Sequence, residues 1–142
     1  MPVKPIYTAE ADVSGGRNGS AKIAEAGLDL TLASPPAMGG DGKGANPEQL
    51  FGAGYAACFI GAMQYATTLD DSLAKVPADA SVNAKVGIGP NDAGGFALAV
   101  DLHVAMPGLE AAEIQRIVDA GHAICPYSNA VRGNVDVNTT IA

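Results

Sequence analysis

The chain has 142 residues, with eight basic and fifteen acidic side chains and a net charge of −7 at pH 7. That length suits one domain with a core of its own, and we expect a single domain over residues 1–142. The acidic balance, with no run of Lys and Arg, argues against nucleic acid or an anionic membrane surface as a partner. A small-molecule partner is the better expectation.

Nothing in the sequence predicts a membrane span or a leader. The apolar run around Cys58 is shorter than the roughly 18 residues that a spanning helix needs, and no hydrophobic stretch like that of a signal peptide follows the first five residues. We therefore expect a soluble cytoplasmic protein. In that reducing environment the only two cysteines, Cys58 and Cys125, are more often catalytic or incidental than a structural disulfide.

The first third of the chain predicts three antiparallel strands. Residues 6–13 and 20–32 carry short runs in which apolar and polar side chains alternate, as in half-buried strands. The glycine-rich turn 15–19 and the pair at 26–27 separate these runs. This pattern places Arg17 at the tip of a hairpin. Residues 34–45, rich in proline and glycine, predict a loop.

A helix is predicted to begin after this loop. Asn46 is a good N-cap, Pro47 suits the first helical position, and Gln49 sits where a capping box reaches back. Glu48 adds a carboxylate to the first turn.

The same helix is apolar in its middle. No charged side chain occurs over residues 50–63, so we expect the helix, which continues to about Leu73, to be buried on all or nearly all sides in a core or an interface. Its centre carries the thiol of Cys58. Gly52 and Gly54 let another helix or a substrate approach the backbone closely.

The second half of the chain predicts strands and helices in alternation. Residues 81–89 and 96–105 predict a hairpin, 109–123 an amphipathic helix, 125–130 a turn or short helix, and 135–141 a last strand. This order predicts an α+β fold whose helices pack against antiparallel sheet.

The two thiols allow three interpretations. They could be inert core residues, since free cysteine is often simply buried. They could form a structural disulfide, worth roughly 4 kcal/mol for a loop of this length, although a cytosolic redox poise opposes it. They could also be a working redox pair. The residues alone leave all three open.

A redox pair would need a thiolate at Cys58. Apolar neighbours raise a thiol's pKa, so a cation has to be supplied. Arg17 at its turn and Arg132 near Cys125 are the two plausible cations, and composition does not choose between them. Glu48 is the natural carboxylate to hold such a guanidinium.

Three motifs, in order along essentially the whole chain, resemble those of the organic hydroperoxide resistance proteins of the OsmC-like superfamily. They are Gly15-Gly16-Arg17-Asn18-Gly19, the stretch Asn46-Pro47-Glu48-Gln49-Leu50-Phe51-Gly52-Ala53-Gly54-Tyr55-Ala56-Ala57-Cys58-Phe59, and Cys125-Pro126-Tyr127-Ser128-Asn129-Ala130. The last two motifs together are highly specific. Gly52, where many relatives carry alanine, is a minor variation.

The resemblance implies a thiol-dependent peroxidase for organic hydroperoxides with an OsmC-like fold. Cys58 would be the peroxidatic thiol on the central buried helix, Cys125 the resolving thiol, and Arg17 with Glu48 the activating pair. It further implies an intertwined homodimer, reduction by dihydrolipoyl groups on carrier proteins more readily than by glutathione, and no metal or organic cofactor.

Other functions remain in play. A metal site that joins His103 and His122 to the cysteines is conceivable, but the spacing matches no usual ligand pattern. The apolar helix could form a pocket for a hydrophobic ligand, with cysteines that only sense oxidation. A third possibility is the sister OsmC branch, with a different peroxide preference; the motif at residues 125–130 favours the first branch.

Helix geometry raises one question about the activating pair. Glu48 and Cys58 would lie about 15 Å apart along a straight helix, too far for one guanidinium to touch both. Either the helix breaks near Gly52 or Gly54, or Arg17 and Glu48 reach the Cys58 of a second subunit. We favour the second arrangement, because an uncharged helix needs covering on every side.

Overall fold

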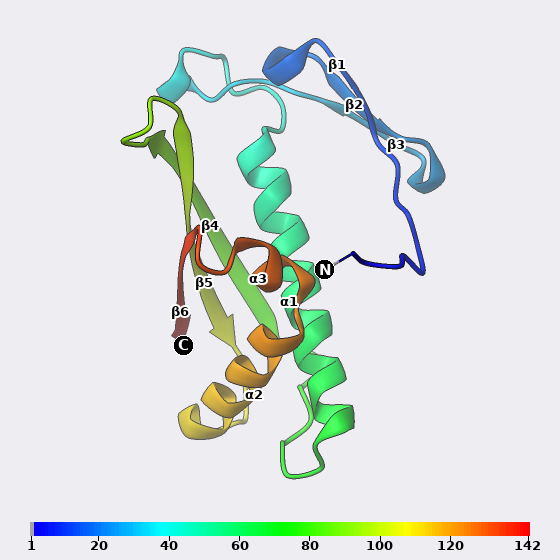
Figure 1. Cartoon of the computed structure of the whole chain (residues 1–142), viewed down its shortest axis with the longest axis vertical. Helices are drawn as coiled ribbons and strands as arrows, with labels where there is room; N and C mark the ends of the chain where they lie inside the picture. Colours follow the sequence, from blue (N-terminus) through cyan, green and yellow to red (C-terminus); the bar gives the residue numbers. More distant parts are fainter. Residues whose placement is uncertain (1) are drawn as a thin grey trace. The chain divides into compact units, whose positions relative to one another are not determined.

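The computed structural model describes residues 2–142 (Figure 1). The chain divides into two compact units between Pro47 and Glu48. Each unit is described by itself.

The first unit contains a three-stranded antiparallel sheet in the order β1-β2-β3. The strands are β1 (Asp12–Ser14), β2 (Ser20–Ile23) and β3 (Leu28–Thr31). The three predicted strands are therefore confirmed, although the first is shorter than the pattern suggested, because residues 6–11 pair with no strand.

The turn between β1 and β2 is built on glycine. Gly15 has φ 76°, a left-handed conformation that favours glycine. A Cβ on Gly19 would lie 1.7 Å from the carbonyl oxygen of Ser14, so no larger residue fits there. The short 3₁₀ turn Gly16–Asn18 lies between these glycines, and it places Arg17 at the hairpin tip, as predicted.

The second unit is α+β, as predicted, with a three-stranded sheet in the order β4-β5-β6. Its elements are α1 (Pro47–Leu69), β4 (Ser81–Pro90), β5 (Phe96–Ala105), α2 (Ala111–Ile124), α3 (Pro126–Val131) and β6 (Asp136–Ile141). β4 and β5 form the predicted antiparallel hairpin. β6 pairs parallel to β5, so this sheet is mixed rather than purely antiparallel. The reason is that α2 and α3 form a crossover connection, which returns the chain in the same direction.

α1 is a continuous helix of 23 residues, without a break at its glycines. It ends at Leu69, four residues before the predicted end. The carboxylate of Asp70 accepts hydrogen bonds from the backbone N–H (2.9 Å) and hydroxyl (2.6 Å) of Ser72, and such local bonds compete with a further helical turn. Lys75 Nζ donates to the carbonyl of Thr67 at 3.0 Å, which satisfies one of the last carbonyls of the helix.

Within the single chain only one side of α1 is buried, and the expectation that a core or an interface covers nearly all of the helix stays a prediction for its other side. Tyr55, Phe59 and Met63 are fully buried in the core of the second unit. Side chains elsewhere on the helix are not covered: Tyr65 is 49% and Leu69 66% exposed. With Leu50 also 40% exposed, α1 has one core side and one side on which the single chain leaves apolar side chains exposed.

The core side of α1 packs against β5, α2 and α3, and two glycines mark the closest approaches. A Cβ on Gly121 of α2 would lie 2.5 Å from Cγ of Met63, so the helices meet there with no room for a side chain. A Cβ on Gly54 would lie 3.0 Å from the hydroxyl of Tyr127. The prediction that small residues in α1 permit a close approach is confirmed at Gly54.

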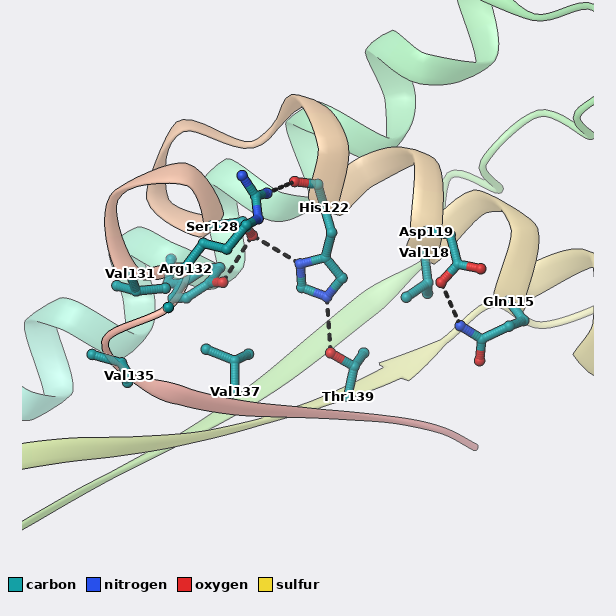
Figure 2. Close-up of a pocket in the computed structure, with 12 residues that line it drawn as sticks. Gln115, Val118, Asp119, His122, Ser128, Val131, Arg132, Val135, Val137 and Thr139 are labelled. Atoms are coloured by element: carbon teal, nitrogen blue, oxygen red, sulfur yellow. Dashed lines mark hydrogen bonds between the residues drawn. The ribbon is translucent and has the colours of Figure 1, made fainter. Parts of the chain in front are cut away.

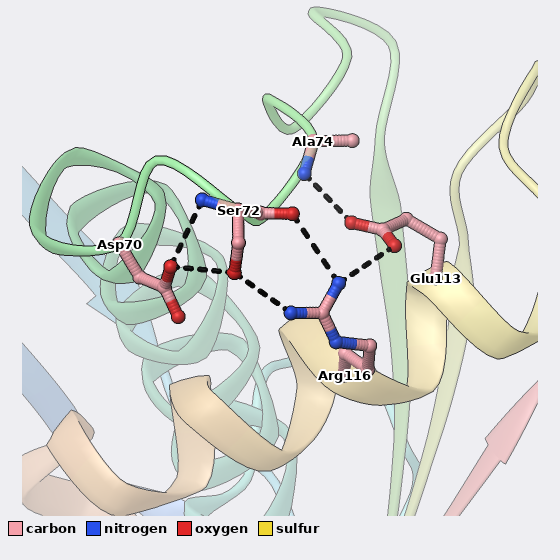
Figure 3. Close-up of polar contacts among 5 residues, drawn as sticks. All are labelled: Asp70, Ser72, Ala74, Glu113 and Arg116. Carbon is pink, nitrogen blue, oxygen red and sulfur yellow. Dashed lines mark hydrogen bonds and ion pairs between the residues drawn. The ribbon is translucent and has the colours of Figure 1, made fainter.

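A polar cluster joins the end of α1 to α2 (Figure 3). Arg116 donates to the carbonyl (3.3 Å) and hydroxyl (2.8 Å) of Ser72 and pairs with Glu113 at 3.1 Å. Glu113 also accepts from the backbone N–H of Ala74 at 2.7 Å. We call Asp70, Ser72, Glu113 and Arg116 the guanidinium cluster. It fixes the segment after α1 against the start of α2.

Candidate active site

The two cysteines lie next to each other in the second unit. Cys58 is in the middle of α1, and Cys125 lies between α2 and α3. Both are reduced, and the thiol of Cys125 donates to the sulfur of Cys58 with 3.7 Å between the Sγ atoms. Cys125 is 0% exposed, whereas Cys58 is half-buried. A small shift would bring the sulfurs to the about 2.0 Å of a disulfide.

The electrostatics of the pair favour the thiol form of Cys58. Burial, the largest cause, raises the pKa of Cys58, and the hydrogen bond and charge of Cys125 raise it further. A backbone hydrogen bond from Tyr127 acts in the opposite direction. Attack by Cys58 therefore requires a source of thiolate stabilisation beyond these neighbours.

Three aromatic rings of α1 and α3 lie close together. Tyr127, two residues after Cys125, has its ring centroid 5.8 Å from that of Tyr55 and 6.2 Å from that of Phe51. Phe51 and Tyr55 form an edge-to-face pair at 6.1 Å. Tyr55 is fully buried, but Tyr127 is exposed and Phe51 half-buried, so these two rings offer an apolar surface that an organic molecule can contact.

A chain of hydrogen bonds connects Ser128, His122 and Thr139 (Figure 2) and continues to Tyr55. The hydroxyls of Tyr55 and Ser128 are 2.8 Å apart, Ser128 Oγ lies 2.8 Å from Nδ1 of His122, and Nε2 of His122 lies 2.9 Å from Oγ1 of Thr139. Phe59 stacks on the imidazole with 4.4 Å between ring centroids. We call Tyr55, Ser128, His122 and Thr139 the imidazole cluster. It joins all three helices of this unit to β6.

The imidazole cluster borders a cavity of about 330 Å³ between α2, the end of α3 and β6. Gln115, Asp119 and Arg132 supply its other polar groups, as Figure 2 shows. Arg132 donates to the carbonyl of His122 at 2.7 Å, so its guanidinium is bound to the end of α2. Burial, the largest cause, holds the pKa of His122 below 6.5; Asp119 raises it and Arg132 lowers it.

The other two predicted site residues lie at the ends of their own segments. Glu48 is in the first turn of α1, ten residues before Cys58 on the unbroken helix, which removes the alternative of a helix that breaks near Gly52 or Gly54. Arg17 is half-buried at the hairpin tip of the first unit. The neighbouring Asn18 accepts from the backbone N–H of Ser34 at 3.0 Å, which ties this tip to the following loop. Within the second unit, the structure thus brings Cys58 and Cys125 together.

The histidines make no metal site with the cysteines. His103 Nδ1 lies 2.7 Å from Oγ1 of Thr140, and His122 is held by Ser128 and Thr139. Among residues 2–142 no group of three His, Cys, Asp or Glu side chains is placed to hold a metal ion. In the same part of the chain, no helix combines the length and apolar character needed to cross a membrane.

Sequence reasoning missed the imidazole cluster. It considered His122 only as a metal ligand, and it gave Thr139 no role. One available signal was a histidine three residues before Cys125, at the end of an amphipathic helix, where its ring lies within reach of the turn that follows. The partner on β6 could not have been found, because it depends on how the strand pairs.

Comparison with known proteins agrees with this fold. A family model described as OsmC-like protein matches residues 40–140. An organic hydroperoxide resistance protein of Xanthomonas axonopodis pv. citri is 51% identical over 99% of this chain and 98% of its own length. OhrA of Bacillus subtilis is 37% identical over 98% of both chains.

Solved structures give the same result. A putative organic hydroperoxide resistance protein from Vibrio cholerae, with captopril bound in one of its active sites, is 43% identical. It matches with a TM-score of 0.89 over 99% of this chain and 95% of that chain. A corresponding protein from Legionella pneumophila is 41% identical, with a TM-score of 0.88 over 98% and 99% of the two chains.

Proposed function

Because this chain belongs to the OsmC-like family, on the branch of the organic hydroperoxide resistance proteins, we propose that it acts in resistance to organic peroxides as a thiol-dependent peroxidase. It reduces organic hydroperoxides to alcohols in the cytoplasm and is recycled by a dithiol. The observation that carries this proposal is the pair of reduced thiols with 3.7 Å between their sulfurs, one half-buried and one fully buried.

The first step is attack by the thiolate of Cys58 on the terminal oxygen of ROOH. The O–O bond breaks, the alkoxide takes up a proton and leaves as alcohol, and Cys58 becomes a sulfenic acid. The peroxide gains two electrons and Cys58 loses them. Cys58 suits this role because it is the sulfur that a substrate can reach.

The second step closes the disulfide. The sulfur of Cys125 attacks that of Cys58, and the hydroxyl group leaves as water with the proton that Cys125 gives up. Full burial of Cys125 keeps this thiol from reacting with peroxide itself. An incoming dithiol then attacks the accessible sulfur of Cys58, Cys125 leaves, and the second thiol of the reductant completes the exchange. Dihydrolipoyl groups on carrier proteins fit this dithiol chemistry.

Arg17 and Glu48 are the pair that we propose to stabilise the Cys58 thiolate. The raised pKa of Cys58 requires such help. Unbroken α1 keeps Glu48 about 15 Å from the Cys58 of its own helix. A second copy of the chain, packed on the exposed apolar side of α1, would supply the pair across a homodimer. The exposure of Tyr65 and Leu69 supports such a copy.

The preferred substrate is organic rather than hydrogen peroxide. The rings of Phe51 and Tyr127 lie 6.2 Å apart on the two helices that flank the thiols, α1 and α3. Each buried methylene of a substrate adds roughly 0.8 kcal/mol of binding.

The test is peroxide consumption at steady state. Purified protein with dihydrolipoamide should consume tert-butyl hydroperoxide faster than hydrogen peroxide, and glutathione should be a poor substitute for the dithiol. Equal rates for the two peroxides would refute the role of the apolar surface. A protein that binds the organic peroxide and oxidises once, without turnover, would instead be a sensor.

Subunit mixing tests the shared site. Cys58→Ser protein and Arg17→Ala protein, each inactive alone, should regain activity when mixed under conditions that exchange subunits, because one site then combines wild-type Cys58 with wild-type Arg17 from the other chain. Arg132→Ala, the alternative cation, should leave the first oxidation largely intact. A mixture that stays inactive despite demonstrated exchange would show that the pair acts within one chain.

A further inference from the structure

The position of the Cys125 sulfur depends on the first turn of α3. The backbone N–H of Ser128 donates to Sγ of Cys125 at 3.5 Å, and the thiol itself donates to Cys58. These are the hydrogen bonds of a fully buried sulfur. Any movement of Ser128 therefore changes where Cys125 points.

Ser128 is itself held from two sides. Its hydroxyl lies 2.8 Å from that of Tyr55 on α1 and 2.8 Å from Nδ1 of His122 on α2. The imidazole is fixed in turn, because Nε2 lies 2.9 Å from Oγ1 of Thr139 and the ring stacks on Phe59. A neutral imidazole donates at one nitrogen and accepts at the other, so one ring can serve both hydroxyls. The imidazole cluster thus fixes the position of Ser128, the residue whose backbone N–H orients Cys125.

We propose that His122 is a positioning residue for the resolving thiol: through Ser128 it fixes the first turn of α3 and holds the sulfur of Cys125 at attack distance from Cys58. This inference rests on the proposed function, in which Cys125 closes the disulfide. His122 touches neither reacting sulfur in this arrangement. Its contribution falls mainly on the second step, because the imidazole cluster ends at Ser128, which bonds to Cys125, and none of its four side chains bonds to Cys58.

Formation of the disulfide between Cys58 and Cys125 can be measured without peroxide by using Ellman's reagent on the reduced protein. The thiolate of Cys58 attacks the reagent's disulfide, one thionitrobenzoate anion leaves, and a mixed disulfide remains on Cys58. Cys125 then loses its proton to solvent and attacks the Cys58 sulfur, so a second thionitrobenzoate leaves and the protein disulfide forms. The rate of the first thionitrobenzoate release reports the reactivity of Cys58, and the rate of the second release reports how well Cys125 is positioned.

His122→Leu should slow the second release by about tenfold to a hundredfold, the loss expected when a reacting group is misplaced by an ångström or less. The first release should change far less, because the imidazole cluster bonds to Ser128 and not to Cys58. His122→Asn keeps a polar atom near the position of Nδ1, within reach of Ser128, and should restore most of the second rate. A merely structural role would not separate the two releases, nor would it respond to this rescue.

His103→Leu is the matched control. His103 Nδ1 lies 2.7 Å from Oγ1 of Thr140, and both residues are exposed. Thr139 and Thr140 are neighbours on β6 whose side chains point to opposite faces of the sheet. His103→Leu therefore removes a similar histidine–threonine bond on the face away from the thiols, and both releases should keep their wild-type rates.

The proposal fails if His122→Leu leaves the second release unchanged, if it slows both releases equally, or if His122→Asn is as slow as His122→Leu. Should His122→Leu not fold, Ser128→Ala decides the matter: it removes the hydroxyl but keeps the backbone N–H, and an unchanged second release would overturn the proposal. A wild-type protein that closes its disulfide here yet consumes no peroxide would refute the proposed function and leave this inference standing.

Discussion

The second unit joins its helices with two polar clusters of opposite kinds. The imidazole cluster lies behind the thiol pair and consists of two hydroxyls, a phenol and a ring whose pKa is held low by burial. The guanidinium cluster lies at the end of α1 and is exposed and charged. Both contain short hydrogen bonds, so distance alone does not distinguish them.

The difference lies in what each cluster can accomplish. Breaking a buried hydrogen bond leaves a polar group without water, which costs about 1–3 kcal/mol and keeps the partners in one geometry. An exposed ion pair exchanges with water and salt at little cost, typically 1 kcal/mol or less. The imidazole cluster is therefore suited to fixing the position of a reacting atom. The guanidinium cluster is suited to holding the segment after α1 against α2.

The largest effect is expected at the thiols beside the imidazole cluster. Cys58→Ser should abolish peroxidase turnover. Cys125→Ser should retain one fast oxidation of Cys58, lose recycling, and become overoxidised under excess peroxide, because no thiol traps the sulfenic acid. Single-turnover oxidation followed by mass spectrometry measures both. Arg116→Ala, in the guanidinium cluster, should turn over like the wild type, and equal loss of the first oxidation in both cysteine variants would contradict the assigned roles.

The next effect concerns the packing that supports the imidazole cluster. Gly121→Ala places a methyl group 2.5 Å from Cγ of Met63 and 3.1 Å from Cε1 of Phe59, the residue that stacks on the imidazole. Overpacking of this kind should lower the free energy of unfolding by about 1–3 kcal/mol, as measured in urea. Gly89→Ala, with nothing within 4 Å of the new methyl, is the control. An unchanged free energy of unfolding for Gly121→Ala would mean that α1 and α2 can move apart at this contact at little cost.

Acid should separate the two clusters. Burial holds the pKa of His122 below 6.5, so the unfolded chain binds a proton more readily than the folded one. His122 thus adds stability that is complete above about pH 6.5 and is lost as pH falls through its depressed folded pKa. The hydroxyl and then the backbone N–H of Ser72 lower the pKa of Asp70 below 3.8, so that contribution persists until far more acid conditions.

The measurement is the free energy of unfolding in urea as a function of pH. Between about pH 7.5 and about pH 5, the wild type should lose stability faster than His122→Asn, which has no imidazole to protonate. Parallel curves would show that His122 does not titrate in this window.

The smallest effect is expected from Arg116→Ala. It removes two hydrogen bonds to exposed Ser72 and the ion pair with Glu113, in which the Arg116 side chain is 50% and the Glu113 side chain 25% exposed. The free energy of unfolding should fall by less than about 1 kcal/mol, and by still less at high salt. A loss as large as that of Gly121→Ala would mean that the guanidinium cluster does more than hold the segment after α1 against α2.

Much of the fold could be read from short patterns. Alternation and the glycines at 15–19 predicted the first hairpin, and the amphipathic run after Pro107 predicted α2. The cap at Asn46 located the start of α1, and the motif after Cys125 marked a turn or short helix that became α3. Such features depend on residues within a few positions of one another, so the sequence carries them directly.

The candidate site was predicted only in part. The sequence singled out Cys58 and Cys125 and, through a family resemblance, Arg17 and Glu48. It offered three interpretations of the two thiols and no distance between them. The 3.7 Å between the sulfurs results from the packing of α2 and α3 on α1, which no local pattern encodes.

What the sequence alone determined are the α+β class, the presence of two thiols as candidate reacting groups, and most element bounds. Tertiary structure decided that β6 runs parallel to β5, that α1 has one uncovered apolar side, and that His122 links Ser128 to Thr139. The physical reason is the same in each case. Strand direction, burial and buried hydrogen bonds depend on which distant segments meet, and that is set by the packing of the whole unit rather than by neighbours in sequence.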